Sequence, residues 1–251
     1  MNNKLFRDDR NGRGGVDAAA ARNKAIADLL SAAGASVSVV KMAIRQSDGS
    51  LMQSVTETIN ADEYAHETDP EGWTNISILR EVTIAYRQVD NIGKLPVAVI
   101  MTDDKQAARE YRPAAIFSMI YTFDIDPDHY TKSEIRSAYD RLRRAEAIRM
   151  KQMEDALTEK GAIIRRYTVT NEDEKIRTAI DTKPLTVRDY IERVSPFEMA
   201  EDSSDRTCTY TIWMNTLAGW LPAFVGRDKD VEEGYLICLP DEDDNEDDEF
   251  E

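Results

Sequence analysis

Alternating carboxylates between two expected elements are the first candidate for chemistry: Asp124, Asp126 and Asp128, with His129 directly after them. Carboxylates at alternate loop positions can converge on Ca²⁺ or Mg²⁺, because both cations prefer several oxygen ligands in one small site. A calcium loop, however, has glycine at its sixth position and glutamate at its twelfth, where this chain has His129 and Ile135. We interpret the segment as a turn whose acids favour the N-terminus of the following helix, and we expect no metal site.

A second cluster contains Glu63, His66, Glu67 and Asp69, which could offer a metal one imidazole and several carboxylates. A solvated loop is the better interpretation, because no cysteine lies near it and the chain has only two histidines. The same scarcity argues against catalytic triads, in which His66 or His129 would have to act as the base. We expect no enzyme, although paired carboxylates leave an enzymatic alternative open in so acidic a chain.

The glycines at residues 12, 14 and 15 precede an expected helix, and helix N-termini attract phosphate. No strand is expected before them, and the Lys-Ser/Thr pair that closes a P-loop is absent. We therefore expect no nucleotide site and no cofactor. Residues 1–15 are interpreted as a flexible arm, either an ordinary frayed terminus or a basic arm that contacts phosphates.

Basic side chains are the strongest candidates for binding. They gather on one expected helix and the strand after it: Arg136, Arg141, Arg143, Arg144, Arg149, Lys151, Arg165, Arg166 and Tyr167. Such a set could form a groove along a sugar-phosphate backbone, with the tyrosine stacking on a base. The alternative is a salt-bridged exterior, since acidic residues of the same helix stand three or four positions from these cations.

The last eleven residues, 241–251, contain nine carboxylates, one asparagine and a single aromatic residue, Phe250. This segment has almost nothing apolar to bury and its charges repel one another, so we expect a disordered tail. It resembles the acidic C-terminal tails of single-stranded-DNA-binding proteins from bacteria and phages, but departs from them by ending on Glu251. The resemblance implies a tail that competes with nucleic acid for the protein's own cationic surface and recruits partner proteins.

Two hypotheses follow for function. In the first, the protein coats single-stranded DNA or RNA, as a viral or phage nucleocapsid or a single-strand binder does, forms homo-oligomers, and screens its own cations with the tail. In the second, it is a non-enzymatic acidic structural or adaptor protein that self-assembles or binds a protein partner, with the tail docking on a basic surface.

Composition agrees with a folded, soluble protein. The formal net charge is −16; without the tail's nine carboxylates, 39 acidic side chains face 32 basic ones, a net charge of −7. Two cysteines and no secretory pattern favour free thiols in a cytoplasmic setting, the host cytoplasm or a virion if the protein is viral. The longest apolar run, residues 114–123, is too short to span a membrane.

The elements that would position these residues follow from periodicity and capping signals. Helices are expected at residues 16–33, 102–112, 114–123, 131–160 and 186–194, with the fourth starting at a capping box and the third buried on every side. Strands are expected at residues 36–45 and 51–59 as a hairpin, and at 76–89, 95–101, 162–170, 206–214 and 235–239. For residues 76–89 a helix through Leu79, Val82, Tyr86 and Val89 is the alternative. Residues 61–74 are interpreted as a loop, and no internal repeat is found.

The expected fold class is therefore α+β, dominated by helices, with short antiparallel β-hairpins and a disordered acidic C-terminal tail. The expected organisation is a flexible arm (1–15), a globular body (16–240) with a possible division near residue 125, and the tail (241–251).

Overall fold

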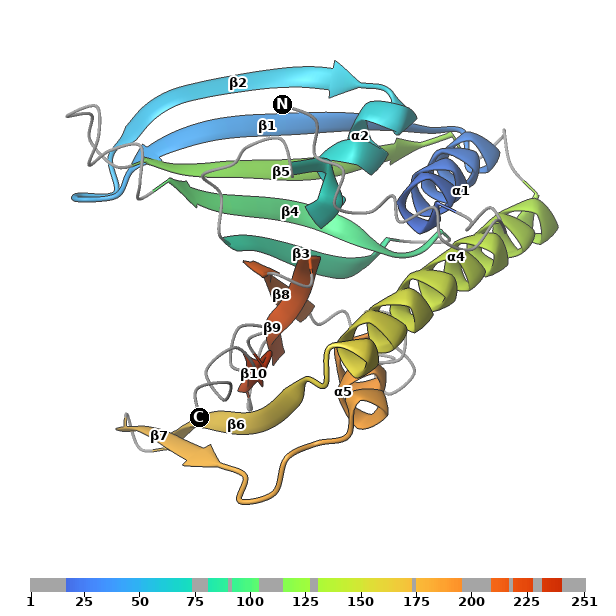
Figure 1. Cartoon of the computed structure of the whole chain (residues 1–251). Helices are drawn as coiled ribbons and strands as arrows, with labels where there is room; N and C mark the ends of the chain where they lie inside the picture. Colours follow the sequence, from blue (N-terminus) through green and yellow to red (C-terminus); the bar gives the residue numbers. More distant parts are fainter. Residues whose placement is uncertain are drawn as a thin grey trace, which may run out of the picture.

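The structure is a computed structural model, and it describes residues 17–73, 81–89, 92–103, 115–126, 131–172, 175–195, 209–216, 219–227 and 232–240. The expected arm (1–15) and acidic tail (241–251) lie outside the described residues. The dominant element is one antiparallel sheet of ten strands, ordered β2-β1-β5-β4-β3-β8-β9-β10-β6-β7 (Figure 1). The expectation of a helix-dominated fold with short hairpins was therefore wrong, because nearly all the hairpins join into one sheet.

The elements fall into two halves along the chain. The N-terminal half contains α1 (Ala18–Ala32), β1 (Ala35–Arg45), β2 (Leu51–Ile59), α2 (Ala61–Glu67), η1 (Pro70–Trp73), β3 (Glu81–Val89), β4 (Gly93–Asp103) and β5 (Ala115–Ile125). The C-terminal half contains α4 (Lys132–Glu159), β6 (Ile163–Glu172), β7 (Lys175–Ile180), α5 (Val187–Val194), β8 (Thr209–Thr216), β9 (Gly219–Arg227) and β10 (Glu232–Cys238).

The strand order is a palindrome. Matching β1 to β5 in sequence with β6 to β10 makes β6 the counterpart of β1, β7 that of β2, and so on. After β2-β1-β5-β4-β3, the sheet continues with the counterparts of these strands in reverse order, β8-β9-β10-β6-β7. The two halves meet where β3 pairs with β8, and there Ile84 lies opposite Thr211, its own counterpart 127 residues later. The halves are thus related by an approximate two-fold axis through this pair, an internal repeat that the sequence pattern did not reveal.

Individual side chains repeat as well. In the N-terminal half, Tyr64 of α2 donates a hydrogen bond to the carbonyl of Pro96 at 2.7 Å and packs edge-on against Tyr121, with ring centroids 5.1 Å apart. In the C-terminal half, Tyr190 of α5 donates to the carbonyl of Pro222 at 2.6 Å, and its ring also lies 5.1 Å from a tyrosine of the last strand, Tyr235. Both tyrosine–proline pairs are 32 residues apart in sequence, so each short helix is fixed to its sheet in the same way.

Glycine turns also repeat, 127 or 126 residues apart. Gly34 and Gly161 follow α1 and α4 with φ of 56° and 63°, and glycine is the residue that most readily adopts this left-handed conformation at a helix C-terminus. Gly93 and Gly219 occupy the β3–β4 and β8–β9 turns, both with positive φ.

The described helices cover one face of the sheet, which we name the inner face; the opposite face is the outer face. Inner-face side chains such as Val39, Ile84 and Trp213 are fully buried. Helices α1 and α4 pack on each other, and α4 extends across both halves of the sheet (Figure 1). The core therefore lies between one helical layer and one sheet layer.

Helix starts follow the sequence closely. Thr131 caps α4 and Thr186 caps α5, each accepting a hydrogen bond from the backbone N–H three residues later, as expected from their position before a helical pattern. The hairpin of β1 and β2 and the strands at β3, β4, β6, β8 and β10 are also confirmed.

Three expected elements were wrong. The apolar run 114–123 forms the central strand β5 rather than a buried helix. Residues 61–74 contain α2, capped by Asn60, and η1 rather than a loop throughout. Residues 102 and 103, expected to begin a helix, end β4, while 104–112 lie outside the described residues.

Candidate nucleic-acid interface

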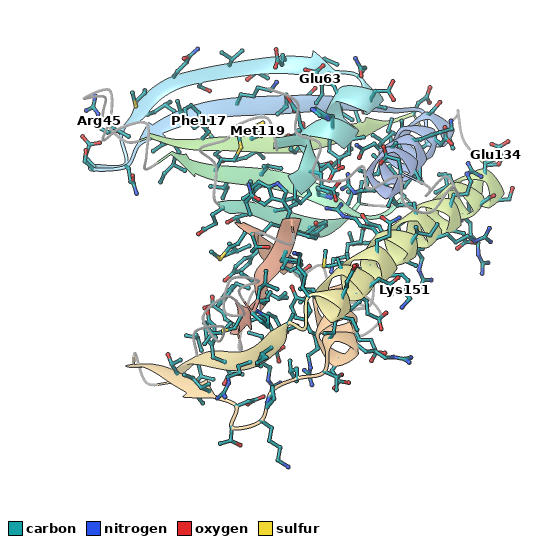
Figure 2. The ribbon with its side chains drawn as sticks, viewed as in Figure 1. Arg45, Glu63, Phe117, Met119, Glu134 and Lys151 are labelled. Carbon is teal, nitrogen blue, oxygen red and sulfur yellow. The ribbon has the colours of Figure 1, made fainter. Side chains whose placement is uncertain are left out.

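The structure does not bring the nine predicted binding residues onto one surface. Arg149 faces the core, Lys151 and Arg166 make ion pairs, Arg165 and Tyr167 lie on β6, and the first four arginines lie on the exposed side of α4. Figure 2 shows Glu134 and Lys151 on α4, on either side of the four exposed arginines in sequence. The predicted continuous groove is thus divided among separate parts of the molecule.

Arg149 belongs to a buried charge cluster at the centre of the fold. Its Nη1 lies 3.2 Å from Oδ1 of Asp69, and its guanidinium lies 5.0 Å from the ring centroid of Trp213, a cation–π contact. Its exposed fraction is only 4%, so no phosphate can reach it. The expectation that Arg149 contacts nucleic acid is inconsistent with this position.

Arg22 of α1 is the counterpart of Arg149, 127 residues earlier, and is equally buried. Its Nε donates to Oε1 of Glu146 at 2.8 Å, while its other nitrogens donate to the carbonyls of Ala65 and Thr68, each at 3.1 Å. The two counterpart arginines therefore meet carboxylates between α1, α4 and the end of α2. Each charge of this cluster has an opposite partner that offsets part of the desolvation cost of burying it, and the cluster joins the two halves.

The buried charge cluster shifts the pKa of the Asp69 carboxyl group. Burial alone would raise its pKa, but the charges of Arg149 and Arg22 outweigh burial and hold the pKa of Asp69 below its usual value. At the neighbouring Glu71, burial prevails and raises the pKa. Asp69 is therefore the acid of this pair that keeps its charge as the pH falls.

A lowered pKa in the folded state makes stability depend on pH. The stabilisation from Asp69 is complete above its unfolded pKa of about 4 and is lost as the pH falls through the lower folded value. We expect Asp69→Asn to reduce stability at pH 7 and to flatten the loss of stability below about pH 4, measured by urea unfolding at several pH values. Asp155→Asn, at a carboxylate 66% exposed, should leave the acid limb unchanged. An unaltered acid limb in Asp69→Asn would contradict this assignment.

Two more predicted residues have acidic partners. Nζ of Lys151 lies 2.8 Å from Asp155 and 3.2 Å from Glu154 on the same helix. On β6, Arg166 lies 2.8 Å from Asp181 and 3.2 Å from Glu233. Lys151 is thus paired as in the salt-bridged alternative, whereas the acids that pair with Arg166 come from other parts of the chain.

Arg165 and Tyr167 point to the outer face, away from α4. Arg165 pairs with Leu236 of β10 and is exposed, while the Tyr167 ring covers Gly234, whose added Cβ would lie 1.9 Å from it. The ring also packs at 6.4 Å from that of Phe224. Tyr167 is thus partly engaged in packing on the sheet rather than free to stack on bases beside the arginines of α4.

Four arginines remain exposed on the first half of α4: Arg136, Arg141, Arg143 and Arg144. Within the part of the chain that the structure describes, Arg136, Arg141 and Arg144 form no salt bridge, and Arg141 contacts only the hydroxyl of Ser137, at 3.2 Å. On α4, this set is the part of the predicted interface that stays open to solvent.

In the second candidate metal cluster, the carboxylates of Glu63, Glu67 and Asp69 lie next to cations. Glu63 and Glu67 both approach Nζ of Lys41, at 3.8 and 2.7 Å, and Asp69 is paired with Arg149. Among the described residues no group of His, Cys, Asp and Glu could hold a metal ion, and residues 127–130 lie outside them.

Comparison with protein-family models, with curated proteins and with solved structures finds no match to this chain. Within the described residues, no helix has both the length and the apolar character needed to cross a membrane.

Proposed function

We propose that the protein binds single-stranded nucleic acid through the exposed arginines of α4, without sequence preference. The observation that carries this proposal is the exposure of Arg136, Arg141 and Arg144 with no described carboxylate at ion-pair distance. They lie within nine residues of one helix, and a guanidinium presents a fork of donors that matches phosphate oxygens. A row of such groups suits a sugar-phosphate backbone.

The mode of binding follows from what surrounds these arginines. Aromatic side chains are absent from 136–144 apart from Tyr139, whose hydroxyl accepts a hydrogen bond from the backbone N–H of Lys94. The interface therefore offers phosphate contacts rather than base stacking, so the affinity should fall steeply with salt.

Charge-removing variants of α4 test this function. Arg141→Gln with Arg144→Gln should weaken binding to oligonucleotides of every sequence and lower the slope of log K against log salt by roughly 1.4, since each single-strand phosphate contact contributes about 0.7. The matched control is Lys24→Gln with Arg188→Gln, which removes the same charge from side chains 77% and 78% exposed elsewhere. Fluorescence anisotropy in a salt series measures both. Equal losses in the two variants, or no binding by the unaltered protein at low salt, would refute the proposal.

The same binding measurement tests whether the acidic tail competes with nucleic acid. If residues 241–251 compete for the arginines of α4, a chain ending at residue 240 binds more tightly at low salt, and the gain disappears in the Arg141→Gln, Arg144→Gln background.

A second candidate function is that of an acidic structural or adaptor protein that self-assembles or binds a protein partner. One observation favours it: large apolar side chains are exposed on the outer face of the sheet, among them Ile100, Ile120 and Met214. Exposed apolar area of this kind is typical of protein–protein interfaces.

A further inference from the structure

The outer face of the sheet is apolar at its centre. Pairing registers place Val40 beside Ile120, Ile120 beside Ala98 and Thr83 beside Ile212, all directed away from the helices. Ile120 is 42% exposed and Ile100 is 38% exposed. These central strands therefore present a row of β-branched and small side chains to solvent.

This centre is also free of charge. Across the described residues of β1, β5, β4, β3 and β8, the outer-face charges lie toward strand ends, at Asp124 on β5 and at Glu81 and Arg87 on β3. A chain with a net charge of −16 repels its own copies unless they meet through a surface without carboxylates. An apolar centre with charges at the rim is the usual anatomy of a protein–protein interface.

The apolar face continues into the C-terminal half. Tyr210 stacks on Phe224 with ring centroids 6.1 Å apart, and Tyr167 extends the row on the other side of Phe224. Beyond them, Leu236 and Ile163 are about half exposed. The apolar surface thus extends into both halves, with Arg165 beside Leu236 as a charge in its C-terminal part.

The area is sufficient for association. With strands about 4.8 Å apart and about 3.4 Å per residue, five central strands over six residues each offer roughly 500 Å² of flat surface per copy. Two such faces together reach about 1,000 Å², the lower limit for a specific interface, before the C-terminal half is counted.

We propose that a second copy of this chain covers the outer face, so that two sheets pack face to face in a two-fold symmetric dimer. An apolar centre with charges only toward its rim offers no cluster of cations or anions to phosphate or to a basic protein, whereas it is complementary to itself, and stacked sheets pack about 10 Å apart through such side chains. This inference rests on the second candidate function and supplies its partner and its surface.

A matched pair of substitutions tests the dimer. Ile120→Glu puts a charge at the centre of the outer face, and Ile148→Glu puts the same charge on α4 at a side chain 41% exposed. By analytical ultracentrifugation, the unaltered protein and Ile148→Glu should sediment as dimers, and Ile120→Glu as a monomer of 28.4 kDa. Ile100→Glu should behave as Ile120→Glu does. Thermal unfolding followed by circular dichroism verifies that each variant is folded.

The outcomes separate the two ideas. If the unaltered protein is a monomer at every concentration tested, both self-assembly and the outer-face dimer are wrong. If it is an oligomer that folded Ile120→Glu and Ile100→Glu leave intact, self-assembly stands and the outer-face dimer is wrong.

Discussion

Replacing Glu146 with alanine is expected to lower the free energy of unfolding by about 3–5 kcal/mol, the cost of removing one partner from a buried ion pair. Glu146 is the carboxylate that faces Nε of Arg22 at 2.8 Å, and both side chains are less than a tenth exposed. Without it, two guanidinium groups, those of Arg22 and Arg149, would remain in the core with Asp69 as the main compensating charge. Urea unfolding followed by circular dichroism measures the loss.

The matched control is Glu154→Ala, two turns later on the same helix. Within the described ranges Glu154 forms its salt bridge with the exposed Lys151, so its loss should cost at most about 1 kcal/mol. Glu146→Gln keeps the size of the side chain and should still be strongly destabilised, because the charge is what the arginines require. Similar effects for Glu146→Ala and Glu154→Ala would show that the cluster does not hold the halves together.

Trp213→Ala should be comparably damaging, at about 3–5 kcal/mol, as expected for truncation of a buried tryptophan. Trp213 is 1% exposed. It lies opposite Val82 on β8, the strand through which the C-terminal half pairs with the N-terminal half. The guanidinium of Arg149 also packs against its ring in a cation–π contact. The truncation leaves a cavity at the junction of the halves and removes the cation–π contact.

Met214→Ala is the control, because the next residue of the same strand points to the outer face and is 41% exposed. At low protein concentration, Met214→Ala should change the midpoint of urea unfolding only slightly. Since Trp213 contacts both halves, its variant should still unfold in one transition at a lower midpoint. Two separate transitions in the unaltered protein would contradict the view that the junction makes the halves cooperative.

Where capping and periodicity agreed, the sequence predicted the elements well. Thr131 and Thr186 marked the starts of α4 and α5, and the hairpin expected from residues 36–45 and 51–59 is formed by β1 and β2, because these are local signals that tertiary contacts rarely override. The apolar run at 114–123 was misassigned because Ile120 on the outer face weakens the alternation that Ser118 and Thr122 give β5, while Met119 and Tyr121 face the helices. A strand with so weak a polar alternation is hard to distinguish from a buried helix by periodicity alone.

The position of Arg149 could have been predicted. It stands four residues after Ala145 and four before Met153, on the same apolar stripe of α4. A cation on a buried stripe indicates a buried ion pair, whereas Arg136, Arg141 and Arg144 lie off the stripe and are exposed. Its partner Asp69 could not be predicted, because the contact joins residues 80 positions apart.

The internal repeat escaped sequence inspection because few side chains preserve it. Its traces are isolated residues at spacings of 126 and 127, such as Tyr64 with Tyr190 and Arg22 with Arg149. Between them the two halves differ in helix length, and no run of identity marks the period. The strand order reveals it, and the counterpart side chains are recognised once the strands are matched.

The palindromic strand order has a consequence for how the two halves associate. As separate molecules, two five-stranded units would expose four sheet edges, whereas in one polypeptide β3 and β8 seal each other and only β2 and β7 stay open. The covalent link also makes their meeting intramolecular, so that sealing does not depend on how dilute the protein is.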